Sequence, residues 1–142
     1  MNIRYRKLLA VTVCTLTLAM IAASDANAQK IAWQSDINHA AQTSQKTKKP
    51  MLIEVGASWC GYCKKMQRET FQNAHIAKHV NACFIPVSID ADAEKKLVQS
   101  MGVRAFPTTV IVSPEMRIVQ VIEGFQSAAE FDGHLERLCK QH

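Results

Sequence analysis

The sequence predicts a single α/β domain built on a mixed β-sheet. Short apolar runs such as 51–55 have the length of buried strands and are too short for helices. Segments with helical periodicity separate the early runs, whereas the last two runs flank only the turn signal 113–116. Helices between the early strands and a hairpin at the end indicate a mixed sheet. A length of 142 residues fits one domain.

The elements can be assigned in order along the chain. We expect a short first strand at 30–33 and then a helix, capped by Ser35 or Asp36, that ends near Thr47. Pro86 cannot donate to a ladder, so its strand should lie at an edge or contain a bulge. The remaining elements are expected to be strand 51–55, helices 61–70 and 74–81, strand 84–89, a helix opened by Asp90 or Asp92 and ended by Gly102, strands 108–112 and 118–122, and helix 127–140.

Residues 1–28 have the layout of a secretory signal peptide. Three basic residues precede an apolar run at 8–23, and Ala26-Asn27-Ala28 is a small-x-small cleavage pattern. We expect cleavage before Gln29, which leaves 29–142 as the mature domain. The alternatives are an uncleaved anchor, although the apolar run is short for a membrane span of about 20 residues, and a lipoprotein, which Val13 before Cys14 disfavours.

The mature chain is only mildly basic. Without residues 1–28, which hold three of the basic residues and one acidic residue, fourteen basic and eleven acidic residues remain, a net charge of +3. These charges are scattered, so nucleic acid is not an expected partner. Four cysteines remain, Cys60, Cys63, Cys83 and Cys139, and export permits them to form disulfides.

Cys60 and Cys63 are spaced for a small reversible disulfide, with the second cysteine one helical turn after the first. If a helix begins at Cys60, free backbone N–H groups and the helix dipole favour its thiolate. Cys63 would then point inward, less exposed and less acidic. This pattern predicts that Cys60 is the attacking nucleophile and that Cys63 is the resolving thiol.

Two other interpretations of this pair are weaker. A zinc ribbon needs a second Cys pair, and the other candidate ligands are His75, His79 and Cys83. A static crosslink over so short a loop would stabilise little. We therefore expect no metal and no cofactor.

At Trp59-Cys60-Gly61-Tyr62-Cys63-Lys64 the sequence resembles the active site of the thioredoxin superfamily. Residues 102–109 resemble the family segment that carries a cis-proline, here Pro107, and Glu54 stands where thioredoxins hold a buried acid. Within the superfamily the chain is most similar to the periplasmic group that includes the C-terminal domain of the transmembrane thiol:disulfide interchange reductase. The resemblance implies a central sheet flanked by helices on both faces and dithiol–disulfide exchange with protein substrates.

The resemblance also implies roles for individual residues. Pro107, if cis, would place Phe106 and a backbone carbonyl beside the disulfide, where a substrate strand pairs; otherwise it simply starts a strand. Glu54, if buried, would have a raised pKa and accept the proton of Cys63; otherwise it is an exposed carboxylate at a strand end. Trp59, Gly61 and Tyr62 are expected to contact the substrate. Trp59 would also shield the site; the alternative is that its role is purely structural.

Two features depart from the family pattern or lie outside it. Gly56 stands where cytosolic thioredoxins carry Trp, so the surface around the disulfide should be more open. Cys83 is expected to be a small buried hydrophobe, while Cys139 is open to pairing with Cys83 or, if exposed, to linkage with a partner.

The leading hypothesis is a periplasmic, monomeric enzyme that reduces disulfides of exported proteins and receives electrons from a membrane-embedded donor. The alternatives are a disulfide oxidase or isomerase, since a Gly-Tyr dipeptide also occurs in periplasmic isomerases, and a non-catalytic module that holds peptides at the Phe106–Pro107 groove. Intact Cys60 and Cys63 disfavour the module. Replacement of Cys60 by serine would distinguish the module from an enzyme, because a module would keep its function and an enzyme would lose turnover.

Overall fold

The computed structural model describes residues 30–140, so the expected signal peptide and its cleavage site lie outside the described residues. Within these residues no helix is both long and apolar enough to cross a membrane. The elements are, in chain order, α2 (Ile37–Thr47), β1 (Met51–Gly56), α3 (Gly61–Met66), the π-helical turn η1 (Gln67–Phe71), α4 (Ala74–Cys83), β2 (Ile85–Asp90), α5 (Lys95–Ser100), β3 (Thr108–Val112), β4 (Ile118–Glu123) and α6 (Ala128–Cys139).

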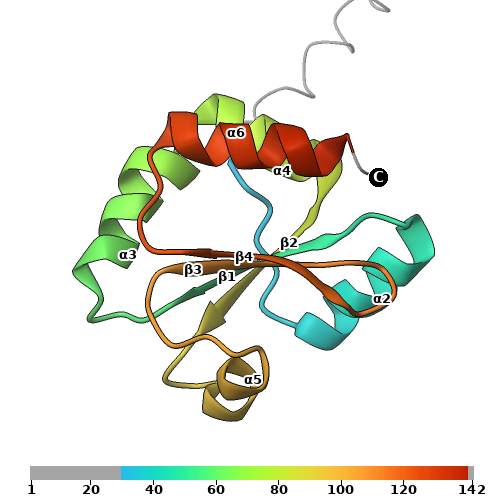
Figure 1. The fold of residues 1–142 in the computed structure, drawn as a ribbon, viewed down its shortest axis with the longest axis horizontal. Helices are drawn as coiled ribbons and strands as arrows, with labels where there is room; N and C mark the ends of the chain where they lie inside the picture. Colours follow the sequence, from blue (N-terminus) through green and yellow to red (C-terminus); the bar gives the residue numbers. More distant parts are fainter. Residues whose placement is uncertain (1–29, 141–142) are drawn as a thin grey trace, which may run out of the picture.

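The four strands form one mixed sheet, as the sequence predicted. Their order is β2-β1-β3-β4, with β1 parallel to β2 and antiparallel to β3, and β4 antiparallel to β3. Helices cover both faces: α4 and α6 lie on one, α2 and α5 on the other (Figure 1). Pro86 lies in β2, an edge strand, which confirms its expected place.

Strand alternation divides the buried side chains between two cores. Leu52, Ile111 and Ile122 pack with Phe131 and Leu135 of α6 on one face. The intervening strand residues, including Ile53, Val87 and Val110, pack with Ala40 of α2 and Val98 of α5 on the other. Because successive strand residues point to opposite faces, Glu54 shares the face of Leu52.

The helix ends follow their capping residues. Asp36 accepts from the N–H groups of Asn38 and His39 at the start of α2, and Ser127 and Glu130 form a capping box at the start of α6. Gly102 has the expected left-handed backbone, with φ +74°. The start of α5 was predicted wrongly: Asp90 accepts from the N–H of Asp92 in a turn, and the helix begins only after Glu94.

The expected strand at 30–33 is also wrong. The Asn81 side chain bonds to Ala32 N and Lys30 O, which satisfies these backbone groups without a ladder. Gln34 forms a single parallel bridge with Val87, and the chain then turns directly into α2.

A disulfide joins Cys83, at the end of α4, to Cys139, at the end of α6, with 5.7 Å between the two Cα atoms. This corrects the expectation that Cys83 is a buried free hydrophobe, because both cysteines are only half-buried and they are paired. It also overturns a linkage from Cys139 to a partner. The pairing itself was among the alternatives.

Candidate active site

Cys60 and Cys63 form a disulfide at the point where the chain passes from β1 into α3. Their Cα atoms are 5.3 Å apart. Cys60 is the N-cap of α3, and its sulfur accepts a hydrogen bond from Cys63 N at 3.1 Å. The sulfur of Cys60 therefore lies beside the free N–H groups of the first helical turn, as predicted, and this position favours a thiolate after reduction.

The relative exposure of the two cysteines is the reverse of the prediction. Cys60 is 6% exposed, whereas Cys63 is half-buried. The reason lies in Gly56, which has no side chain to cover Cys63. A hollow of about 270 Å³ opens there, lined by Cys63 but not by Cys60. The expected openness around Gly56 is thus present, and it is located beside Cys63.

Glu54 lines the same hollow. Burial raises the pKa of its carboxyl group above the ordinary value of 4.5, and a hydrogen bond from Ser88 Oγ at 3.1 Å partly opposes this shift. Ser88 stands beside Glu54 in the parallel register of β1 and β2. Glu54 is therefore a half-buried acid rather than an exposed carboxylate.

Gly56 brings Glu54 and Cys63 to the same small space. A Cβ atom on Gly56 would lie 2.7 Å from Glu54 Oε1 and 3.4 Å from Cys63 Sγ. The first distance is a clash, so any larger residue would displace the carboxyl group. The carboxyl group and the sulfur thus face each other across a glycine.

The residues expected to contact substrate lie around the rim of the disulfide. Trp59 and Tyr62 are each 66% exposed, and Gly61 is also exposed. The ring of Trp59 contacts that of Phe106 edge to face, with centroids 6.0 Å apart. The peptide bond between Phe106 and Pro107 is cis. The Trp59 contact therefore brings the cysteine loop and the segment before β3 together, although they are far apart in sequence.

The sequence analysis did not identify two polar residues of the site. Ser88 bonds to Glu54, and Asp92 Oδ2 accepts from Trp59 Nε1 at 2.9 Å. Asp92 was interpreted only as a helix cap. The one available signal for Ser88 was its position as a polar residue within the apolar strand 84–89.

Potential metal ligands occur elsewhere, between α4 and α6, where His75, His79 and Asp132 approach one another. His79 also lies near Cys83 and Cys139, but these two sulfurs are joined in a disulfide.

A mixed four-stranded sheet with a Cys-x-x-Cys disulfide at a helix N-terminus defines the class of thioredoxin-fold thiol–disulfide oxidoreductases. A model of the thioredoxin-like domain family matches residues 37–138, and the chain belongs to this family.

Relatives and solved structures agree with this assignment. The chain is 36% identical to a protein disulfide-isomerase of Datisca glomerata over 93 residues, 64% of this chain and 18% of that protein. It is 25% identical to the thiol:disulfide interchange protein DsbD of Photorhabdus laumondii over 113 residues, 76% and 19% of the two chains, which confirms the resemblance within the superfamily. It thus spans about a fifth of these relatives. The structure of the DsbH oxidoreductase shares the fold, with a TM-score of 0.71, 20% identity and coverage of 80% and 87%.

Proposed function

We propose that the protein is an exported thiol–disulfide oxidoreductase that reduces disulfides of other exported proteins. The observation that carries this proposal is the Cys60–Cys63 pair at a helix N-terminus, with a half-buried acid facing the second cysteine. Metal and cofactor have no part in the proposed reaction.

In the reduced enzyme the Cys60 thiolate attacks one sulfur of a substrate disulfide. The substrate S–S bond breaks, a mixed disulfide forms, and the other substrate sulfur leaves as a thiolate that takes up a proton. Cys63 then loses its proton and attacks the Cys60 sulfur. This step releases the second substrate thiol and leaves the Cys60–Cys63 disulfide.

Glu54 is the proposed acceptor of the Cys63 proton. Its position across Gly56 from the Cys63 sulfur supports this role, and so does its raised pKa, because a carboxylate of higher pKa is a stronger base towards a thiol. The hollow beside both groups gives water access, so the proton can pass on to solvent.

The substrate is proposed to bind along the rim formed by Trp59, Tyr62 and Phe106, with Gly61 allowing close approach. Exposed aromatic rings next to a nearly buried Cys60 support this surface. The backbone at Phe106, held in place by Pro107, would pair with an extended substrate segment, as strand-addition sites do.

An exported reductase needs a source of electrons. The likeness to DsbD and the signal-like segment at 1–28 support a periplasmic location, cleavage before Gln29, and a membrane-embedded donor. We propose that the mature domain, residues 29–142, acts as a monomer. The mass of the protein recovered from the periplasm would test the location and the cleavage, and its elution volume would test the monomeric state.

The likeness to a protein disulfide-isomerase favours a second candidate, an oxidase or isomerase. The reduction potential of the Cys60–Cys63 pair separates the two functions, and glutathione buffers with thiol trapping at the Cys60 peptide would measure it. A potential near −270 mV supports the reductase, whereas one near −120 mV would overturn it in favour of oxidation or isomerisation.

A further inference from the structure

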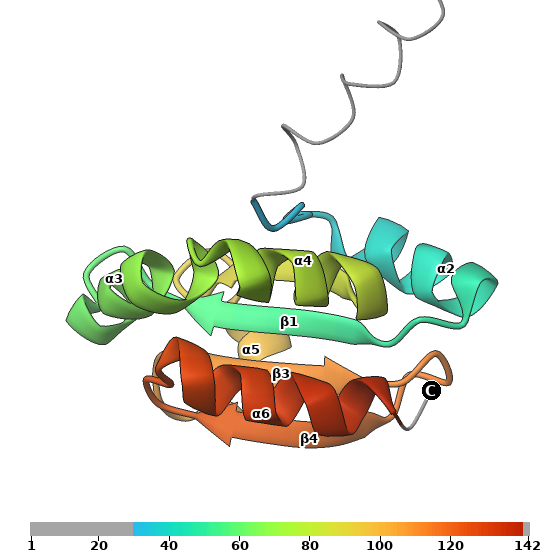
Figure 2. The same ribbon diagram turned by 90° about the horizontal axis from the view of Figure 1, so that it is seen from above.

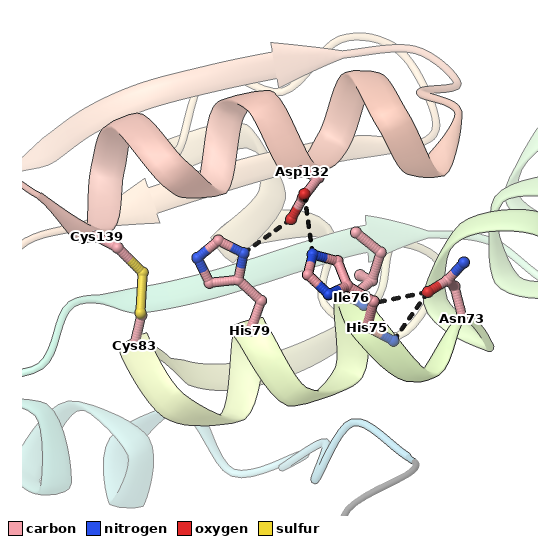
Figure 3. Close-up of polar contacts among 7 residues, drawn as sticks. All are labelled: Asn73, His75, Ile76, His79, Cys83, Asp132 and Cys139. Atoms are coloured by element: carbon pink, nitrogen blue, oxygen red, sulfur yellow. Dashed lines mark hydrogen bonds and ion pairs between the residues drawn. A yellow bond between two sulfur atoms is a disulfide. The ribbon is translucent and has the colours of Figure 1, made fainter.

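A second group of reactive side chains lies between α4 and α6, around the Cys83–Cys139 disulfide. Figure 3 shows His79 one turn before Cys83 on α4, with Asp132 of α6 beyond it. One ring nitrogen of His79 and the two sulfur atoms all lie within 4.8 Å of one another. All three residues are half-buried, so the group is accessible from solvent.

The hydrogen bond to Asp132 selects the tautomer of His79. Its Nδ1 lies 2.8 Å from Asp132 Oδ1. The pKa of Asp132 is lowered, chiefly by this bond, so the carboxylate is ionised and can only accept. Nδ1 therefore carries a hydrogen, so in the neutral form of the ring the free lone pair is on the other nitrogen, Nε2. That nitrogen is on the side of the disulfide (Figure 3).

The disulfide is also bordered by positively charged surface. A hollow of about 310 Å³ is lined by Cys83 and Cys139 together with Lys48 and Lys49. His79 lines a second hollow, and Ala82 lines both. The volume of the first hollow is at the small end of the range of ligand pockets, roughly 300–1,000 Å³. Lysine side chains at its wall attract carboxylates and stabilise a thiolate.

We propose that Cys83–Cys139 is a second site of thiol–disulfide exchange, at which His79 acts as general base for a small thiol that carries carboxylates. The C-terminal ends of α4 and α6, where this disulfide lies, are at the opposite side of the fold from α3, which begins directly after Cys60 (Figures 1 and 2). The second site therefore works independently of the function proposed for Cys60–Cys63.

The exchange proceeds in two balanced steps. His79 takes the proton of the incoming thiol, whose sulfur attacks one cysteine and breaks the Cys83–Cys139 bond. The other cysteine leaves as a thiolate and takes the proton back from His79. A second thiol molecule then attacks the mixed disulfide, which yields two cysteine thiols and the oxidised small thiol. Two thiols are oxidised for each protein disulfide reduced.

The test uses the full chain with Cys60→Ser and Cys63→Ser, so that the remaining disulfide of the described residues is Cys83–Cys139. Reduced glutathione is added under native conditions, and mass spectrometry of alkylated samples follows the mixed disulfide. In this background His79→Gln, which keeps a polar side chain of similar size, should slow the reaction about tenfold. This tenfold factor is smaller than the rate increase that a general base usually provides, because part of the thiol is already ionised near neutral pH.

Two controls separate the proposal from simple exposure of a disulfide. His75→Gln on the same helix, which leaves His79 and its bond to Asp132, should change the rate by less than about twofold. Lys48→Ser with Lys49→Ser should slow glutathione but not cysteamine, a thiol without carboxylates. Equal rates for His79→Gln and its parent would overturn the proposal, as would a rate that is independent of thiol concentration, because reduction would then depend on unfolding.

Discussion

The two disulfides of the described residues join chain segments of very different separation. Cys60 and Cys63 are three residues apart and lie at the N-terminus of α3, whereas Cys83 and Cys139 are 56 apart and join the ends of α4 and α6. By the chain-entropy model, the long loop stabilises the fold by about 4 kcal/mol and the short one by about 2 kcal/mol. The long disulfide thus contributes more to the stability of the fold than the short one does.

The two disulfides also differ in the side chains that face them. The Cys60–Cys63 pair faces the carboxyl group of half-buried Glu54, whose pKa is raised by burial. The Cys83–Cys139 pair faces His79, which is bonded to an ionised carboxylate. The first environment suits the transfer of a proton from a thiol that is held inside the protein, and the second suits a thiol that arrives from solvent.

The largest expected effect is on catalysis, at the short disulfide. Cys60→Ser should lower the rate of disulfide reduction at least ~10³-fold, because the nucleophile is removed. It should lower the free energy of unfolding by about half as much as loss of the long disulfide does. Turnover of a protein disulfide with a chemical reductant, together with urea unfolding, would measure both. Retained turnover would contradict the assignment of Cys60.

The next effect should be on stability, at the long disulfide. Cys83→Ser combined with Cys139→Ser should lower the free energy of unfolding by about 4 kcal/mol and leave the turnover of the folded protein at Cys60 unchanged. Urea unfolding of the variant and the parent gives the difference. A loss below about 1 kcal/mol would mean that α4 and α6 are held together without the bond.

Glu54→Gln tests the role of the acid beside the short disulfide through the pH dependence of stability. The pKa of Glu54 is higher in the folded chain than its ordinary value of 4.5, so its contribution to stability is fully present below the unfolded pKa and is lost as pH rises through the folded pKa. The variant should lack this decline in stability and should release mixed disulfides about tenfold more slowly. Urea unfolding across pH and single-turnover kinetics are the measurements, and an unchanged release rate would exclude Glu54 as the base.

The smallest effect is expected from Gly56→Ala. The added Cβ would lie 2.7 Å from Glu54 Oε1, so the carboxyl group must move away from Cys63. We expect a severalfold slower release of the mixed disulfide and a loss of roughly 1 kcal/mol of stability. Gly133→Ala on α6 is the control for release, since Gly133 is outside the site and its Cβ would come no closer than 3.8 Å, to Arg137 Nη1. Equal effects of the two substitutions would show that Gly56 has no special role.

Local sequence patterns were enough to predict most of the fold. The strand beginning at Met51 and the helix capped by Ser127 lie where the pattern of apolar and capping residues placed them. The first strand failed because the groups that satisfy Lys30 and Ala32 belong to Asn81, about fifty residues away. The site shows the same limit: spacing identified Cys60 and Cys63, but their relative exposure depends on the hollow beside Gly56, which is a property of the assembled fold.

The position of β1 has a consequence for the motions of the site. This strand is hydrogen-bonded on both sides, to β2 and to β3, and it carries Glu54 and Gly56 before the chain enters the cysteine loop. In native-state hydrogen exchange, amides of such a central strand open last, whereas edge strands open earlier. We therefore expect Glu54 and Gly56 to lie in a part of the sheet that opens rarely, so that the acid keeps its distance from the cysteine while the edge strands open and close.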